Sequence, residues 1–153
     1  MQVSAAVTLQ PDISELILCA DPRYVCETYV FEPNEREVSL GRLVAVAETE
    51  ARDGVGNDLL DMVISAIQRE YYRDPSRGIL PSFESALHQA NLVLHDSVDR
   101  GVRDWMGYFN VAIGALAGNV LHISVAGEAM VLLARRTRVA TISYGLSHLP
   151  ITN

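Results

Sequence analysis

Residues 43–47 read Leu-Val-Ala-Val-Ala, and this unbroken apolar run decides the fold class of the chain. A strand with one face in water alternates apolar and polar residues, whereas a continuous apolar run is typical of a central strand covered on both faces. We therefore expect a buried central strand at Leu43–Ala47. Upstream of it, the apolar run Leu16–Ala20 and the β-forming residues Tyr29–Phe31 predict shorter strands.

Two helical patterns follow the central strand. Between Asp58 and about Tyr72, apolar residues recur at helical spacing, and Asp58 is the expected N-cap. The second pattern starts after Pro81-Ser82 and extends to about Arg100, with Ser82 as the expected N-cap. Each pattern has a single apolar face. We therefore expect an antiparallel helix pair that packs on one face of a sheet.

The last third of the chain returns to β structure. Residues 109–117 are mostly apolar and lead into Gly118-Asn119, a strong two-residue hairpin signal. Alternation over Val120–Ala126, a tight turn at Gly127-Glu128 and two more apolar stretches between residues 130 and 143 predict an antiparallel meander. Strands, two consecutive helices and more strands, in this order, predict an α+β fold.

The composition is that of an ordinary globular domain. Of the 153 residues, 49% are apolar and 20% are charged. We expect residues 1–153 to form a single domain. No apolar run approaches the roughly 18 residues of a membrane span, and the first residues lack the basic and then apolar pattern of a signal peptide. We therefore expect a cytoplasmic protein with no membrane partner.

The charges argue against several functions. The net charge is −7, and all twelve basic residues are arginines. An acidic domain repels phosphate backbones, and we interpret the cluster Arg135, Arg136 and Arg138 as a solvated turn, so no nucleic-acid partner is expected. The absence of lysine excludes a Walker-type phosphate loop and Schiff-base chemistry.

The cysteines and histidines show no spacing of a known metal motif. Cys19 and Cys26 are not a C-x-x-C pair, and we interpret both as small hydrophobes. A disulfide between them is the less favoured alternative in a reducing compartment. His88 and His95 share a polar helical stripe but lie about two helical turns apart, too far for one zinc ion. We interpret that stripe as a solvated face with Glu84–His88 and His95–Asp99 pairs.

Three short stretches of the sequence resemble motifs of a known family. The order and spacing of the three stretches support the resemblance more strongly than any one stretch does. Residues 121–135 form two apolar segments joined at Gly127-Glu128. Residues 41–49 form an apolar segment that ends in Glu48-Thr49, and residues 23–28 read Arg-Tyr-Val-Cys-Glu-Thr. Together they resemble the N-terminal portion of PPM-type (protein phosphatase 2C-like) metal-dependent Ser/Thr phosphatases. That family has Val-Gly-Asp-Ser-Arg, Asp-Gly, and an arginine followed by Asn-Glu-Asp at these places.

The resemblance implies a PPM-phosphatase-like β-sandwich with αββα layers, an antiparallel helix pair and a site for two divalent cations. It implies that Arg23 binds the substrate phosphate, because a guanidinium offers a bidentate fork to phosphate oxygens. It implies that Glu27 ligates one cation and that Glu48 stands where the family has a bridging aspartate. Bridging two cations is geometrically demanding. Glu48 is longer by one methylene, and Thr28 and Thr49 replace further family residues.

A second alignment of the strand-end motif stays open. Residues 53–57 read Asp-Gly-Val-Gly-Asn, which matches the family's Asp-Gly-x-Gly-Gly more literally and would make Asp53 the metal ligand. This string lies six residues past the apolar strand and adjoins the expected helix cap. The placement of the strand and the cap therefore favours Glu48.

These replacements lead us to expect a non-catalytic phosphatase-like (pseudophosphatase) domain with a binding or regulatory role. The chain stops before the family's later metal-binding aspartates, so we expect an incomplete sandwich and no cofactor. The expected partner is another protein or a second copy of the chain. One alternative is an active protein Ser/Thr phosphatase, dependent on Mg²⁺ or Mn²⁺, of which this is the N-terminal piece. Another is a structural subunit that forms oligomers through an exposed sheet.

Overall fold

The computed structural model describes residues 12–17, 19, 21–50 and 55–144, and the architecture is α+β, as the order of the patterns predicts. The helices are α1 (Val55–Tyr72) and α2 (Ile79–Asp99). The strands are β1 (Tyr24–Phe31), β2 (Arg42–Glu50), β3 (Phe109–Ala117), β4 (Val120–Ala126), β5 (Met130–Arg135) and β6 (Arg138–Tyr144). None of the described helices has the length and apolar character needed to cross a membrane.

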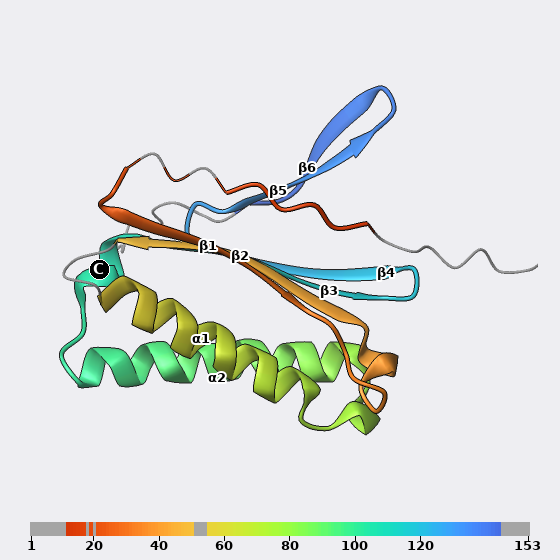
Figure 1. Ribbon diagram of the computed structural model, residues 1–153, viewed down its shortest axis with the longest axis horizontal. Coiled ribbons are helices and arrows are strands. Elements are labelled where there is room, and N and C mark those ends of the chain that lie inside the picture. The colour runs from red at the N-terminus through yellow and green to blue at the C-terminus, as the bar shows by residue number, and fades with distance from the viewer. Residues whose placement is uncertain (1–11, 18, 20, 51–54, 145–153) are drawn as a thin grey trace, which may run out of the picture.

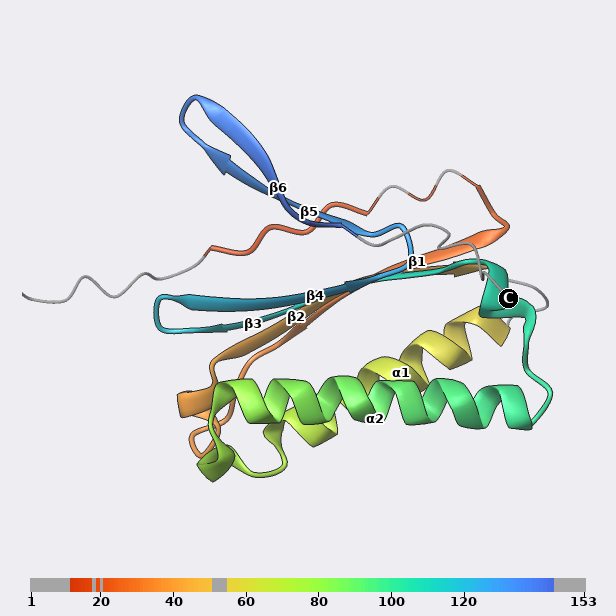
Figure 2. The same cartoon turned by 180° about the vertical axis from the view of Figure 1, so that it is seen from behind.

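Strands β1 to β4 form one antiparallel sheet in the order β1-β2-β3-β4, and β5 and β6 form a separate antiparallel pair. Both helices cover the same face of the four-stranded sheet and run antiparallel to each other (Figure 1). The β5–β6 hairpin lies on the other side of the sheet and turns away from it, as the view from behind also shows (Figure 2). The expected helix pair on one sheet face is therefore confirmed.

The core lies between the sheet and the helices. On β2, Leu43, Ala45 and Ala47 are buried, because alternate side chains of a strand point to the same face. On α1, Tyr71 is fully buried and donates its hydroxyl to the carbonyl oxygen of Leu40 at 2.6 Å. Fully burying a Leu or Ile side chain contributes about 1.5–3 kcal/mol. This helix-covered face therefore supplies most of the burial that holds the fold together.

The opposite face of the four-stranded sheet, here termed the open face, is less covered than the sequence predicts. The apolar run Leu43–Ala47 predicts burial on both faces, but Val46 is 58% exposed and Leu121 on β4 is 49% exposed. The prediction of a strand covered on both faces is wrong. An αββα sandwich would place a second full sheet here, whereas the described residues place the two-stranded β5–β6 hairpin and the irregular segment before β1 on this side.

The chain leaves the four-stranded sheet at Gly127. Strands β4 and β5 do not pair, so the expected meander is broken into two hairpins that belong to different sheets. Gly127 has a φ of +69°, and a Cβ there would lie 2.3 Å from both the Phe109 carbonyl oxygen and the Asn110 Oδ1. The turn is therefore packed tightly onto the start of β3. This packing directs the chain over the open face, so that β5 does not become a fifth strand.

Three local predictions need correction. Helix α1 begins before Asp58, which lies in its first turn and is not the N-cap. Helix α2 begins before Pro81-Ser82, so Ser82 is buried inside the helix and is not its N-cap. Proline is tolerated there because the first N–H groups of a helix have no intrahelical partner. The described residues of Leu16–Ala20 form no strand.

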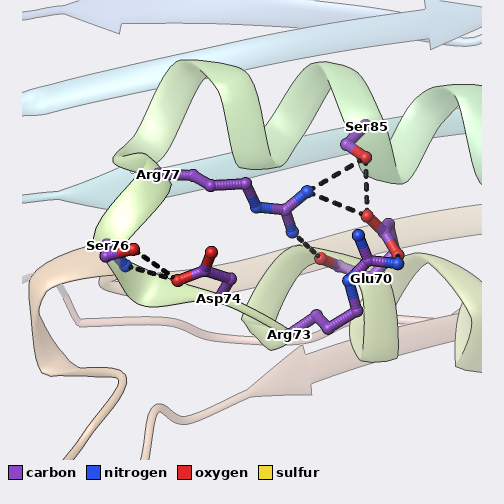
Figure 3. Close-up of polar contacts among 6 residues, drawn as sticks. All are labelled: Glu70, Arg73, Asp74, Ser76, Arg77 and Ser85. Atoms are coloured by element: carbon purple, nitrogen blue, oxygen red, sulfur yellow. Dashed lines mark hydrogen bonds and ion pairs between the residues drawn. The ribbon is translucent and has the colours of Figure 1, made fainter.

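A charged network joins the two helices at their connection (Figure 3). Glu70 of α1 is only 8% exposed, and its carboxylate accepts hydrogen bonds from Ser85 of α2 at 2.6 Å and from Arg77 at 3.0 Å. Arg77 also donates to the carbonyl oxygen of Glu70 at 2.9 Å, and Arg73 pairs with the carboxylate at 2.9 Å. The hydrogen bonds from Ser85 and then Arg77 lower the pKa of Glu70 below its ordinary value. Glu70 is thus a buried carboxylate with charged partners.

Candidate functional site

Polar side chains gather at one end of the open face, and we term them the Glu48 cluster: Cys26, Glu48, Tyr108 and Asn110. The strand register makes Cys26 on β1 and Asn110 on β3 the direct cross-strand partners of Glu48 on β2. Direct cross-strand partners point to the same face of a sheet. Three strands and the residue before β3 therefore bring these four side chains together.

Glu48 accepts hydrogen bonds from all three neighbours. Its Oε2 accepts from the Tyr108 hydroxyl at 3.0 Å and from the Asn110 side-chain amide at 3.2 Å. Its Oε1 accepts from the Cys26 thiol at 3.5 Å. All three donors are neutral groups, so none of these contacts compensates a negative charge on Glu48.

The donors of the cluster hold their protons firmly. Burial raises the pKa of Tyr108 to about 12, and the hydrogen bond to Glu48 adds to the shift. Burial also raises the pKa of the Cys26 thiol to about 12, with further contributions from Cys19 and then Glu48. Desolvation and a nearby carboxylate both disfavour the charged forms of these groups. Tyr108 and Cys26 therefore remain protonated donors at neutral pH.

Asn110 ties the cluster to the turn at Gly127-Glu128. Its side-chain oxygen accepts a hydrogen bond from the backbone N–H of Glu128 at 2.7 Å, while its amide donates to Glu48. Any side chain at Gly127 would collide with this oxygen. A single side chain thus connects the carboxylate on β2 with the turn that leads into β5.

The Glu48 cluster borders a groove of about 380 Å³ between the sheet and the start of β5. Glu48, Asn110 and Glu128 line its polar part, and residues 129–132 line its apolar part. An apolar hollow of about 180 Å³ continues along the open face, lined mainly by Val44, Val46, Ala112, Gly114, Leu121, Ile123 and Val131. The open face is therefore polar at the end that carries the Glu48 cluster and apolar along the rest of its strands.

A larger hollow of about 490 Å³ lies between α1 and α2. Charged residues of both signs line it, including Arg69, Asp96 and Arg100. Arg100 and Asp96 pair at 3.5 Å with both side chains more than 60% exposed, which is typical of a solvated helix face. We place the candidate site at the Glu48 cluster because polar groups from separate strands converge on one carboxylate there.

Of the predicted site residues that the structure describes, Arg23, Glu27 and Glu48, only Glu48 lines the groove. Arg23 is exposed, and its guanidinium pairs with Asp21, with Nε at 2.9 Å from Oδ2. The register puts Glu27 on the face that the helices cover, opposite to the face of Glu48. Asp53 lies outside the described residues. The roles of Arg23 in phosphate binding and of the three carboxylates in metal binding therefore stay predictions.

Three members of the cluster are not found by sequence reasoning. Sequence reasoning interprets Cys26 as a small hydrophobe, and an aromatic residue just before a strand, such as Tyr108, is typical of core or interface packing. Asn110 is the one available signal, since an amide inside an apolar strand needs partners if it is buried, and it is 9% exposed. Within the described residues, no group of three or more His, Cys, Asp or Glu side chains is arranged to hold a metal ion.

No protein-family model, curated protein or solved structure matches this chain. The site is therefore characterised by its own geometry: one carboxylate, three neutral donors and a groove that continues into an apolar hollow. Such an arrangement offers hydrogen bonds at one end and apolar contact along the rest. This combination of groups suits the binding of a partner.

Proposed function

We propose that this chain is a non-catalytic binding domain on a PPM-phosphatase-like scaffold, with the Glu48 cluster and its groove as the binding site. The observation that carries the proposal is that both oxygens of Glu48 already accept hydrogen bonds from side chains of the same chain. A carboxylate that bridges two cations must direct its oxygens to both ions. Glu48 would have to exchange its present donors for metal ions before it could take that role.

Three features support the PPM-like scaffold. The element order β-β-α-α-β-β-β-β agrees with the order of the resembling stretches along the sequence. The antiparallel helix pair on one sheet face corresponds to an outer layer of an αββα sandwich (Figure 1). Gly127 has a φ of +69° in the turn where the family has a glycine.

The surroundings of Arg23 also favour binding over catalysis. A phosphate-binding arginine needs its guanidinium fork free for the substrate oxygens. Here the fork is bound to Asp21, and this hydrogen bond lowers the pKa of Asp21 and raises that of Arg23. The pair is exposed, so a ligand could displace it. Without such a ligand, the Arg23 guanidinium is paired with Asp21 of the same chain.

A phosphatase assay tests the proposal. With an aryl phosphate and Mn²⁺ or Mg²⁺, we expect no turnover above that of the metal ion alone. Turnover that Glu48→Ala abolishes would contradict the proposal and favour the active-phosphatase alternative. Glu27→Ala is a companion variant, because Glu27 is another predicted metal ligand but lies on the opposite face. An enzyme that uses the family's ligand set loses activity in both variants.

A second candidate function, self-association through the open face, is favoured by exposed apolar residues on the sheet and on the hairpin. Met130, Leu132 and Val139 of the hairpin are 59%, 55% and 68% exposed. A face of four strands about 4.8 Å apart and about seven residues long measures roughly 450 Å². With the hairpin, the patch approaches the roughly 800 Å² per partner that a stable interface buries. A second copy, with the same apolar face, is the expected partner.

Light scattering at micromolar concentration tests self-association. We expect a dimer or larger assembly, which Val46→Glu converts to a monomer because a charge in the contact would have to be desolvated. Leu92→Glu is the matched control, since Leu92 is 46% exposed but lies on α2, away from the open face. A stable wild-type monomer that binds no hydrophobic dye contradicts this function.

A further inference from the structure

Two thiols meet beside the Glu48 cluster. The Sγ of Cys26 lies 2.6 Å from the Sγ of Cys19, and both cysteines are free. A disulfide bond is about 2.05 Å long, so the two sulfurs need to approach each other by only roughly half an ångström to reach bonding distance. Cys19 is exposed, whereas Cys26 is half-buried. The two residues therefore differ in how readily a reagent from solvent can reach them.

A tight turn before β1 brings the thiols together. The backbone N–H of Arg23 donates to Asp21 Oδ1 at 2.9 Å, and the N–H of Tyr24 donates to the Asp21 carbonyl oxygen at 3.1 Å. The Cys19 thiol also donates to the carbonyl oxygen of Tyr24 at 3.3 Å. A preformed turn reduces the entropy lost when the loop closes, so the two thiols have a high effective concentration.

A second contact holds the preceding segment on the same side of β1. Thr28 donates its hydroxyl to Glu15 at 2.7 Å. Cys26 and Thr28 are two positions apart on β1, so both side chains point to the open face. A covalent bond between Cys19 and Cys26 would therefore fasten the segment before β1 to the open face.

We propose that Cys19 and Cys26 form a reversible intramolecular disulfide, in which exposed Cys19 reacts first with a low-molecular-weight disulfide and Cys26 resolves the adduct. The proposal stands on the distance between the sulfurs and on the turn that holds them. It does not depend on the resemblance to phosphatases.

The chemistry is a double thiol–disulfide exchange. The Cys19 thiolate attacks one sulfur of oxidised glutathione, the S–S bond of that oxidant breaks, and one glutathione thiolate leaves. The Cys26 thiol, which is protonated at neutral pH, gives up its proton as its sulfur attacks the Cys19 sulfur of the mixed disulfide and displaces the second glutathione thiolate. The protons lost by the two cysteines are taken up by the two leaving thiolates. Two protein thiols are oxidised, and one glutathione disulfide is reduced to two thiols.

Oxidation changes the contacts of Glu48. A disulfide sulfur carries no proton, so Glu48 Oε1 loses its donor, while Tyr108 and Asn110 still donate to Oε2. The released oxygen lies beside the groove, where a donor on a partner can reach it. The cysteine pair thus couples the thiol redox state to the polar end of the open face.

The test uses the full chain, first reduced, then incubated with oxidised glutathione, quenched with acid and treated with N-ethylmaleimide. We expect a mass loss of two hydrogen atoms, no uptake of maleimide, and migration as a single chain on a non-reducing gel. Dithiothreitol should restore both thiols. A stable glutathione adduct, a disulfide between chains, or two thiols that still take up maleimide would overturn the proposal.

Matched serine variants test the order of the two steps. Cys26→Ser is expected to stop at a glutathione adduct on Cys19, because the resolving thiol is missing. Cys19→Ser is expected to react roughly tenfold more slowly, because Cys26 is half-buried and less accessible. Equal rates for the two variants would overturn the assigned order. The wild-type mass measurement stands independently of how either variant folds.

Discussion

Glu70 and Glu48 lie on opposite sides of the four-stranded sheet and have contrasting partners. Glu70, on the helix side, is 8% exposed and is bound by Ser85 and Arg77, with Arg73 at its outer edge. Glu48, on the open face, accepts hydrogen bonds from Cys26, Tyr108 and Asn110, which are all neutral. One carboxylate is charge-compensated within the chain, and the other is not compensated by these contacts.

The contrast indicates different roles for the two carboxylates. A buried carboxylate with arginine partners is an internal connection, because removing either partner would leave the other charge buried and unpaired. A carboxylate with neutral donors beside a groove still offers its charge to an incoming group. Glu70 therefore connects α1 to α2, and Glu48 is the better candidate for contact with a partner.

The largest effect is expected when the turn beside Glu48 is disturbed. In Gly127→Ala, the new Cβ would lie 2.3 Å from the Phe109 carbonyl oxygen and 2.3 Å from the Asn110 side-chain oxygen. The alanine would also have to adopt the left-handed backbone conformation of Gly127, with its φ of +69°. We expect a loss of about 3 kcal/mol in the free energy of unfolding, from backbone strain together with the steric clash. Urea denaturation measures it.

Gly118→Ala is the control for this variant. Gly118 also has a positive φ of +57°, but a Cβ there meets nothing within 4 Å. It should cost only about 1 kcal/mol, the backbone strain alone. Equal losses in the two variants would show that the packing of the Gly127 turn on Asn110 is unimportant.

The second effect concerns the helix side. Glu70→Gln leaves Arg77 without its charged acceptor in a largely buried site, so we expect a loss of about 2 kcal/mol in the free energy of unfolding. Arg73→Gln removes the 67% exposed partner of the same carboxylate and should cost less than about 0.5 kcal/mol. Urea denaturation of both variants checks this, and a similar loss in each would refute the view that Arg77 is the main partner.

The third effect belongs to the Glu48 cluster itself. Tyr108→Phe removes one donor from Glu48, but Asn110 still donates to the same oxygen. We expect a loss of about 1 kcal/mol in the free energy of unfolding. Tyr29→Phe, which removes an exposed hydrogen bond to Asp61, is the control and should cost less. If Tyr108→Phe lowers the free energy of unfolding as much as Glu70→Gln does, the charged partners of Glu70 stabilise the fold no more than the neutral partners of Glu48 do.

The smallest effect is expected in the pH dependence. The pKa of Glu70 is lower in the folded chain, so the stability that this shift contributes is fully present above the unfolded pKa and is lost as pH falls through the folded pKa. Wild type should therefore lose more stability than Glu70→Gln on acidification from pH 7 to below about pH 4. Urea midpoints for both proteins across this range provide the measurement. Parallel curves would mean that Glu70 has the same pKa in both states.

Much of the local structure is predictable from the sequence. The hairpin of β3 and β4 begins and ends where the apolar runs and the Gly118-Asn119 turn predict. Both helices form over their periodic stretches, because a single apolar face must be buried against the sheet. The exact helix starts are missed, since the residue types at Asp58 and Ser82 are compatible with a cap as well as with a first turn.

The site is only partly predictable for a physical reason. Glu48 stands out because a carboxylate ends an apolar strand. Its partners come from β1 and from the entry to β3, so their proximity depends on the register between strands that are far apart in the sequence. Residue composition alone cannot specify that register, because a shift by one residue would turn every side chain to the other face.

The sequence by itself determines the α+β class, the two helices and the β3–β4 hairpin, because these depend on periodicity and turn residues within short segments. Only the tertiary structure decides that one sheet face stays open, that Cys26 and Asn110 flank Glu48, and that Cys19 reaches Cys26. The tight packing of Gly127 onto β3 turns the chain out of the sheet. Such packing arises from contacts between distant segments, which no local pattern encodes.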